Sequence, residues 1–195
     1  IRDLVRSRGL GDVYKRQRLE TGELTREQVM LGRFHEFFES EGLPTDQVKV
    51  FNDEYQIRLG DKAFFCDHGD ELVKQLKATV KQYAVTNGTT VAQERKLRFS
   101  GLDQLLDGVF ISEQVGVDKP QKAFFDAVWN EIGSYAPDEV VIVGDSLTSD
   151  IRGGKNAGIL TCWYNPDHLP NKIEVTPDCT IDNLQDILLY LDESR

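Results

Sequence analysis

The stretch VVIVGDSLTSD, residues 140–150, decides the fold class that the sequence predicts. Its first four residues are all aliphatic, which is typical of a strand buried on both faces of a parallel sheet. The run ends at Gly144 and Asp145, and Asp150 follows five residues after Asp145. Ligands bind at the carboxyl ends of the strands in such sheets, so two carboxylates at this place predict a functional site.

Further strands and helices alternate around this stretch. Apolar runs predict strands, and amphipathic patterns predict helices; the strands are at 82–86, 109–112 and 159–163, and the helices at 70–79, 91–97, 120–132 and 182–191. Such alternation is typical of βαβ units, whose strands are parallel. Residues 70–190 are therefore predicted to form a Rossmann-like α/β core, a parallel sheet with helices on both faces.

Residues 18–62 have a different pattern. Thr25 and Gln28 have the spacing of a capping box at a helix start. Apolar side chains recur at helical spacing on either side of a break at 42–44; they are Met30, Phe34, Phe37, Phe38, Val48, Phe51, Tyr55 and Leu59. Stripes of this kind are usually packing surfaces. We expect two helices that pack as a hairpin and form a partial helical cap, followed by the core over residues 63–195.

Residues 1–17 do not share either pattern. The chain begins with Ile1 rather than Met, and this opening segment is basic whereas the rest of the chain is acidic. It has no sustained helical or strand periodicity. We interpret residues 1–17 as a non-native or disordered segment; a basic N-terminal arm is the alternative.

Composition limits the classes of function. The chain has 195 residues, of which 39% are hydrophobic, with a net charge of −10 and a pI near 4.8. This is the composition of a globular protein, and its acidity argues against a nucleic acid polymer as partner. The longest aliphatic run has four residues, whereas a membrane span needs about 20. Cys66, Cys162 and Cys179 lack CxxC spacing, which predicts neither a disulfide framework nor a zinc site and favours a reducing cytoplasm.

Polar motifs fall at the predicted strand ends and at a helix start. They are Thr86-Asn87-Gly88, Lys119-Pro120, and Asp145 with Asp150. We expect a hydroxyl, backbone N–H groups, one ammonium and two carboxylates to face one crevice. This set suits a phosphoryl group with Mg²⁺, because Thr86, the Asn87 amides and Lys119 would meet phosphate oxygens while the carboxylates hold the metal.

These motifs resemble those of a known family. The segments that carry the resemblance are 85–88 (VTNG), 119–120 (KP), 143–150 (VGDSLTSD), 153–158 (GGKNAG) and 161–166 (TCWYNP). They are similar to motifs two to four of the haloacid dehalogenase (HAD) superfamily and to its pyrimidine 5′-nucleotidase-like subgroup. The similarity covers about residues 18–190, including the predicted cap remnant at 18–60.

The resemblance implies Mg²⁺-dependent hydrolysis of a phosphomonoester, with a nucleoside monophosphate as substrate, through an aspartyl-phosphate intermediate. The residues to which it assigns phosphate binding are Thr86, Asn87, Gly88 and Lys119. Thr86 and Lys119 are also expected to be catalytic. Asp145 is expected to ligate Mg²⁺, with Asp150 supporting the metal site. The implied partner is a small phosphorylated metabolite or nucleotide.

The chain departs from the family at the first motif. There the family has a strand that ends in DxD, and the first of these carboxylates is the covalent nucleophile. Asp3 is followed two residues later by Val5, and Asp12 by Tyr14, so neither supplies the pair. That strand lies at the centre of the family's sheet. We therefore expect the core to lack its first central strand and the chain, as written, to be inactive or incomplete.

Asp67 is the remaining candidate nucleophile, because it ends the apolar run of residues 63–66. Gly69 stands where the second carboxylate of the pair should be. A helix cap at Asp70 explains this stretch better, and we reject Asp67 as the nucleophile.

Other families with similar groups fit less well. A receiver domain places its metal-binding carboxylates before the Thr and Lys, whereas here they come after them. A Walker P-loop needs a hydroxyl residue after Gly154-Lys155, where the chain has Asn156. Two alternatives stay open: a non-catalytic relative that binds phosphorylated ligands, and a HAD phosphatase that acts on another small phosphorylated metabolite.

Overall fold

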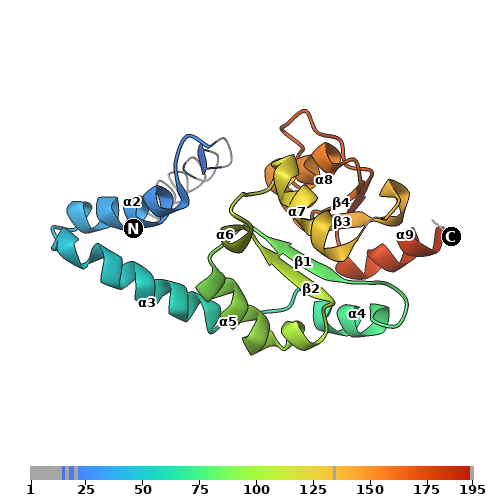
Figure 1. The fold of residues 1–195 in the computed structure, drawn as a ribbon, viewed down its shortest axis with the longest axis horizontal. Helices are drawn as coiled ribbons and strands as arrows, with labels where there is room; N and C mark the ends of the chain where they lie inside the picture. Colours follow the sequence, from blue (N-terminus) through green and yellow to red (C-terminus); the bar gives the residue numbers. More distant parts are fainter. Residues whose placement is uncertain (1–14, 16–17, 20–21, 134, 194–195) are drawn as a thin grey trace. The chain divides into compact units, whose positions relative to one another are not determined.

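The computed structural model describes residues 15, 18–19, 22–133 and 135–193. The chain divides into two compact units, residues 1–59 and 60–195, whose elements are drawn in Figure 1. Most of the predicted segment 1–17, including Asp3 and Asp12, lies outside the described residues. No helix among the described residues combines the length and the apolarity needed to span a membrane.

From Arg26 onward, the described residues of the first unit form two α-helices. Helix α2 (Arg26–Ser40) is followed by a 3₁₀ turn, η1 (Thr45–Gln47), and by α3 (Val48–Gly60). The predicted capping box is confirmed, because the Thr25 hydroxyl accepts the Gln28 N–H at 3.2 Å and the Gln28 side chain accepts the Thr25 N–H at 2.8 Å. Phe34 of α2 packs edge-on against Phe51 of α3, with ring centroids 5.0 Å apart. The aromatic stripes are thus packing surfaces, as predicted.

The strands of the second unit all pair in parallel. Strand β1 (Tyr83–Thr86) pairs with β2 (Gly108–Ile111), β3 (Val141–Gly144) with β4 (Leu160–Tyr164), and β4 with β5 (Cys179–Ile181). The predicted parallel α/β fold is confirmed. Strand β5 was not predicted, because three residues are too few to show an alternating pattern.

Helices lie between successive strands along the chain, except that β5 follows β4 without an intervening helix. The α-helices are α4 (Gly69–Leu76), α5 (Thr90–Ser100), α6 (Ser112–Val115), α7 (Lys122–Ile132), α8 (Arg152–Ala157) and α9 (Ile187–Glu193). Shorter turns are the 3₁₀ segments η2 (Leu102–Gln104), η3 (Pro137–Glu139) and η5 (Leu184–Asp186) and the π-helical segment η4 (Leu147–Ile151). Pro120 precedes α7 rather than opening it, because Gln121 is the N-cap residue.

One sheet was expected, and the described residues form two. The first contains β1 and β2, and the second contains β3, β4 and β5. Within the described part of the chain, the edge of β1 opposite β2 and the edge of β3 opposite β4 pair with no strand. Val143, in the middle of β3, is 39% exposed. Two separate parallel sheets are what the predicted loss of a central strand would leave.

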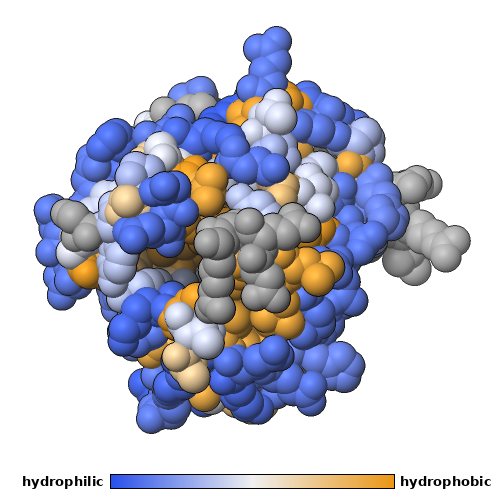
Figure 2. All heavy atoms as spheres, turned by 90° about the vertical axis from the view of Figure 1, so that its right-hand side faces the viewer, coloured by the Kyte–Doolittle hydropathy of each residue, from blue (hydrophilic) through white to orange (hydrophobic). Residues whose placement is uncertain are grey.

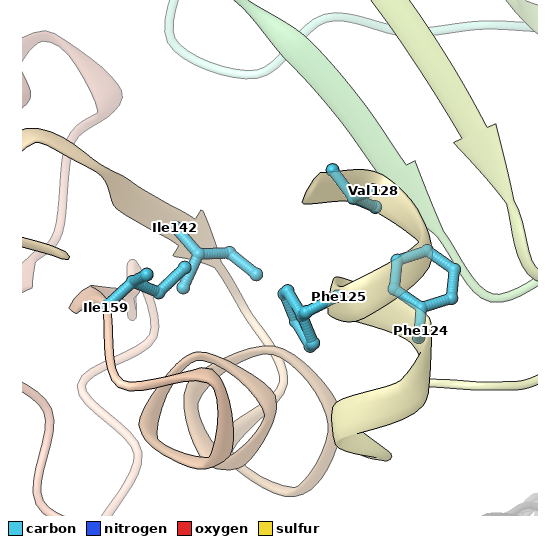
Figure 3. Packing of buried hydrophobic residues seen from close by; sticks show 5 residues of the cluster. All are labelled: Phe124, Phe125, Val128, Ile142 and Ile159. Atoms are coloured by element: carbon cyan, nitrogen blue, oxygen red, sulfur yellow. The ribbon is translucent and has the colours of Figure 1, made fainter. Parts of the chain in front are cut away.

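Helices cover both faces of the second sheet. Phe125 of α7 points towards Ile142 and Ile159, as Figure 3 shows from close by, and Phe124 and Val128 of the same helix belong to the same buried cluster. On the other face, Leu72 of α4 and Ile187 of α9 pack with Cys162 and Ile181, and Val141 joins this second cluster. Neighbouring residues of a strand point to opposite faces, so Val141 and Ile142 belong to different clusters. The predicted helices on both faces are confirmed here.

Apolar side chains are also left at the surface of the second unit. Figure 2 shows hydrophobic surface gathered in the middle of one face, surrounded by hydrophilic residues. The exposed apolar residues of this unit include Phe64, Val143 and Leu189. Contiguous apolar surface of this kind usually marks a place that another segment or molecule covers.

Gly154 allows α8 to approach the second sheet closely. A Cβ at this position would lie 2.5 Å from Cγ2 of Ile142 and 2.6 Å from Cγ2 of Thr161. Both neighbours belong to strands, so neither can move away cheaply. We expect Gly154→Ala to lower the free energy of unfolding by about 1–3 kcal/mol, the usual cost of overpacking, measured by denaturant titration.

Gly32→Ala is the matched control for this prediction. Gly32 lies within α2, where an added Cβ would meet nothing within 4 Å. Replacing a helical Gly by Ala should leave stability unchanged or raise it by up to about 1 kcal/mol. Equal stability of Gly154→Ala and the wild type would contradict the described packing of α8.

The Asp178 carboxylate holds the segment that precedes β5 in place, and it makes the stability of the fold depend on pH. Its carboxylate accepts hydrogen bonds from the Thr161 N–H and hydroxyl, both at 2.8 Å, and from Lys155 Nζ at 2.6 Å. Burial alone would raise the pKa of Asp178, but the hydrogen bonds from Lys155 and Thr161 outweigh it and lower this pKa below its ordinary 3.8.

A folded-state pKa below the unfolded one means that these bonds stabilise the fold at neutral pH. Their contribution is lost as the pH falls through the folded-state pKa of Asp178. We expect Asp178→Asn to be less stable than the wild type at pH 7, with the difference shrinking towards pH 3. Denaturant titrations of both proteins at the two pH values measure this. A difference that stays constant would show that the charge of Asp178 is not involved.

Candidate active site

Three segments meet at the carboxyl ends of β1 and β3. They are the residues that follow β1, the loop that precedes α7, and the residues that follow β3. Hydrogen bonds among Asn87, Lys119 and Asp150 join them. The sequence predicted that these three residues would come together, and the structure brings them together.

Lys119 lies at the centre of this arrangement. Its side chain is buried, and Lys119 as a residue is only 4% exposed. The ammonium donates to the Asp150 carboxylate at 2.7 Å and to the Val85 carbonyl oxygen at 2.6 Å. An ammonium has three N–H donors. Within the described part of the chain one donor therefore stays available to an anion.

Asp150 is held against the end of β3. One of its carboxylate oxygens accepts from Lys119, and the other accepts the Ser146 N–H at 3.1 Å. The π-helical turn η4 folds this carboxylate back over Gly144. A Cβ at Gly144 would collide with the Asp150 side chain. The glycine that ends the strand is therefore required by the close approach of Asp150.

Asn87 has a side chain turned towards the Lys119 loop. Its Nδ2 donates to the Lys119 carbonyl oxygen at 2.8 Å, and its Oδ1 accepts the Lys119 N–H at 2.9 Å. The N–H of Gly88 donates to the Ser112 hydroxyl at 3.2 Å. The side chain of Asn87 and the amide of Gly88 thus have partners within the protein.

Thr86 and Asp145 have uncommitted side chains in the same region. Thr86 is the last residue of β1, and Asp145 follows the last residue of β3. Neither the Thr86 hydroxyl nor the Asp145 carboxylate makes a hydrogen bond to any described residue; only the main-chain oxygen of Asp145 does, accepting from Trp163 Nε1 at 3.0 Å. A free hydroxyl and a free carboxylate are the kinds of group that bind phosphate and a divalent cation, respectively.

Of the two carboxylates expected at the metal site, only that of Asp145 has oxygens available to bind Mg²⁺. Among the described residues no group of three or more His, Cys, Asp or Glu side chains could hold a metal ion. Asp145 has a free carboxylate, whereas both oxygens of Asp150 already accept hydrogen bonds. Mg²⁺ often binds through one or two carboxylates, with water and substrate phosphate completing the shell. Asp145 therefore fits as a ligand, and Asp150 fits the supporting role that was expected of it.

Asp67 is committed to the fold. Its carboxylate accepts from the Tyr164 hydroxyl at 2.8 Å and from the Leu184 N–H at 3.1 Å. The hydrogen bond to Asp67, together with burial, raises the pKa of Tyr164 to about 12. Asp67 ties the start of α4 to the C-terminal region, which agrees with its rejection as nucleophile.

The expected helix cap at Asp70 is wrong. The helix begins one residue earlier, and its N-cap residue is His68, which has a left-handed backbone conformation and makes no side-chain cap. Asp70 lies in the first helical turn, where it pairs with Lys74 one turn later at 2.9 Å. Carboxylates favour the first turn as well as the cap, so the charge pattern located the helix start without identifying the cap.

Sequence reasoning missed the residues that hold this site in place. Ser149 accepts from Asn87 Nδ2 at 3.2 Å, and Asn156 Nδ2 donates to the Pro120 carbonyl oxygen at 2.9 Å. Both residues lie in stretches that were quoted for the family resemblance. Their hydrogen bonds join segments far apart in the chain, so no local pattern could have revealed them.

The chain is similar to proteins of one known family. Residues 7–158 match the haloacid dehalogenase-like hydrolases. Pyrimidine 5′-nucleotidase PynA of Streptococcus pneumoniae (strain ATCC BAA-255 / R6) is 34% identical over 177 residues, which cover 90% of this chain and 74% of that protein. Pyrimidine 5′-nucleotidase YjjG of Escherichia coli (strain K12) is 31% identical over 168 residues, 86% of this chain and 73% of that protein.

A third relative is similar in both sequence and structure. The HAD-hydrolase YfnB of Bacillus subtilis (strain 168) is 35% identical over 168 residues, 86% of this chain and 71% of that protein. A crystal structure of YfnB bound to magnesium superposes with a TM-score of 0.89 and 32% identity, covering 98% of this chain and 84% of that one. The chain therefore belongs to the haloacid dehalogenase-like hydrolases.

Proposed function

We propose that this chain carries the phosphate-binding and cation-binding groups of a Mg²⁺-dependent phosphomonoester hydrolase that acts on nucleoside monophosphates. The observation that carries the proposal is the buried Lys119 ammonium, which has one unused donor at the ends of β1 and β3. The Val85 carbonyl that it binds is one residue from Thr86, whose hydroxyl is free of described partners. The names of PynA and YjjG as pyrimidine 5′-nucleotidases support a nucleotide as substrate.

In this proposal the chain's own residues bind and orient the phosphoryl group. The Thr86 hydroxyl, the Asn87 main-chain N–H and the remaining Lys119 donor bind phosphate oxygens. Asp150 keeps the Lys119 ammonium in place. Asp145 would hold Mg²⁺, which when bound offsets negative charge on the transferred group.

The covalent nucleophile is the group that the described residues do not supply. Asp67 is occupied by Tyr164 and Leu184, and Asp145 and Asp150 serve the cation and Lys119. Nucleophilic attack requires a carboxylate in line with phosphorus. A strand between β1 and β3 that ends in a carboxylate would place one at the ends of both neighbouring strands.

A non-catalytic relative is the second candidate function. It is favoured by the same observation, since phosphate-binding groups without a nucleophile among the described residues can still bind a phosphorylated ligand. A hydrolase specific for another small phosphorylated metabolite is a further alternative, because cap residues set specificity in the family that the chain resembles.

Restoring the first motif tests the proposal. We expect the chain as written to release phosphate from nucleoside monophosphates several orders of magnitude more slowly than an intact enzyme, because binding groups alone recover little of the effect of a nucleophile. Replacing residues 1–17 with a strand ending in DxD and a first cap helix should restore Mg²⁺-dependent release. Phosphate release with and without Mg²⁺ measures both, and thermal unfolding should show a higher Tm for the repaired chain.

Asp145→Asn in the repaired chain tests the cation site. Losing the ligand charge should abolish the response to Mg²⁺. Asp103→Asn is the matched control, because Asp103 is exposed in η2, and it should leave Mg²⁺-dependent release unchanged. Enzyme-like turnover by the unrepaired chain would contradict the interpretation that this chain lacks a nucleophile. A repaired chain that folds and binds phosphate without hydrolysing it would favour the non-catalytic alternative.

A further inference from the structure

Asn87 makes hydrogen bonds that a phosphate ligand does not use. Its Oδ1 accepts the Lys119 N–H at 2.9 Å, and its Nδ2 donates to the Lys119 carbonyl oxygen at 2.8 Å. One side-chain amide therefore satisfies both main-chain polar groups of the same residue. Its Nδ2 also donates to the Ser149 hydroxyl at 3.2 Å, which links the loop to the segment after β3.

We propose that Asn87 is a positioning residue that clamps the main chain of Lys119 and thereby fixes where the Lys119 ammonium lies. This inference rests on the proposed function for the importance of Lys119, and it assigns the Asn87 side chain a role other than phosphate binding.

The hydrogen bonds from Asn87 act on the Lys119 main chain, where a small displacement would move the ammonium away from its partners. The Lys119 side chain is long and flexible, and losing its rotamer freedom on burial is costly. Its ammonium nevertheless reaches both the Val85 carbonyl and the Asp150 carboxylate. Both contacts require the Lys119 Cα to stay at one distance from β1. Asn87 directly follows β1, so its bonds tie that Cα to the strand itself.

The residue type at position 87 follows from this geometry. A clamp on one residue's N–H and carbonyl needs an acceptor and a donor on the same short side chain, and Asn provides both. Asp has the same shape but no donor when ionised, so it would keep the bond to the Lys119 N–H and lose the bond to the carbonyl. Ala would lose both. Asn87→Asp should therefore remove one of the two hydrogen bonds to the Lys119 main chain, and Asn87→Ala should remove both.

The reactivity of the Lys119 amine reports the clamp directly. The 195-residue chain is treated with a trace of acetic anhydride, and mass spectrometry gives the acetylation rate of each lysine. We expect Asn87→Ala to raise the rate at Lys119 by about tenfold, because loss of both hydrogen bonds to the Lys119 main chain and of the one to Ser149 favours local opening of the loop. Asn87→Asp should give an intermediate rise. Lys122 and Lys49, which are exposed, should change by less than about twofold because they need no opening.

Asn171→Ala is the matched control. Asn171 also bridges main-chain groups, accepting the Ile173 N–H at 3.0 Å and donating to the Val175 carbonyl at 2.7 Å, but in an exposed loop. It should leave the rate at Lys119 unchanged. An unchanged rate at Lys119 in Asn87→Ala would overturn the inference. A rise shared equally by all lysines would also overturn it, since that would show general loosening. Asn87→Asp provides the same readout if Asn87→Ala does not fold.

Inorganic phosphate separates this inference from the proposed function. Phosphate added together with Mg²⁺ and bound at the Lys119 ammonium should lower its acetylation rate in the wild type. If phosphate gives no protection while Asn87→Ala still exposes Lys119, the proposed function fails and the clamp stands. If phosphate protects Lys119 equally in the wild type and in Asn87→Ala, with equal rates in its absence, the clamp fails and phosphate binding stands.

Discussion

The Lys119 ammonium connects the two sheets of the second unit. It binds the Val85 carbonyl in β1 and the carboxylate of Asp150, which follows β3. These two strands share no backbone hydrogen bond within the described part of the chain. The ammonium, together with the hydrogen bond from Asn87 to Ser149, therefore joins the ends of strands that a sheet would otherwise hold by a ladder. The position of Lys119 decides whether the binding groups at the two strand ends face each other.

This dependence explains the local structure around the lysine. A buried charge is tolerated only when it is paired and hydrogen-bonded, and removing one partner leaves an uncompensated charge. Asp150 pairs with the ammonium, Gly144 provides the room for that carboxylate, and Asn87 fixes the main chain from which the lysine extends. Each of these residues acts through Lys119, so they form one unit and not a set of independent contacts.

The sequence predicted those parts that depend on local chemistry. Apolar runs located β1, β3 and β4 to within one or two residues, and polar residues at strand ends and at a helix start located Thr86, Lys119 and Asp150. The parts it did not predict depend on contacts between distant segments. The clamp by Asn87 and the role of Asp67 in binding Tyr164 both join residues far apart in the chain. Strand β5 is too short for periodicity, and the cap at His68 lacks the side-chain bond that cap rules assume.

The charges at the strand ends also explain why the proposed function includes a cation there. Asp145 and Asp150 carry two negative charges, and Lys119 carries one positive charge that Asp150 already neutralises. A phosphate group would therefore meet the unpaired charge of Asp145, which is exposed to solvent, and water and salt weaken the repulsion between exposed charges without removing it. A divalent cation at Asp145 reverses the sign of the local charge. In the proposed function, these three side chains would therefore bind phosphate together with a cation, whatever group supplies the nucleophile.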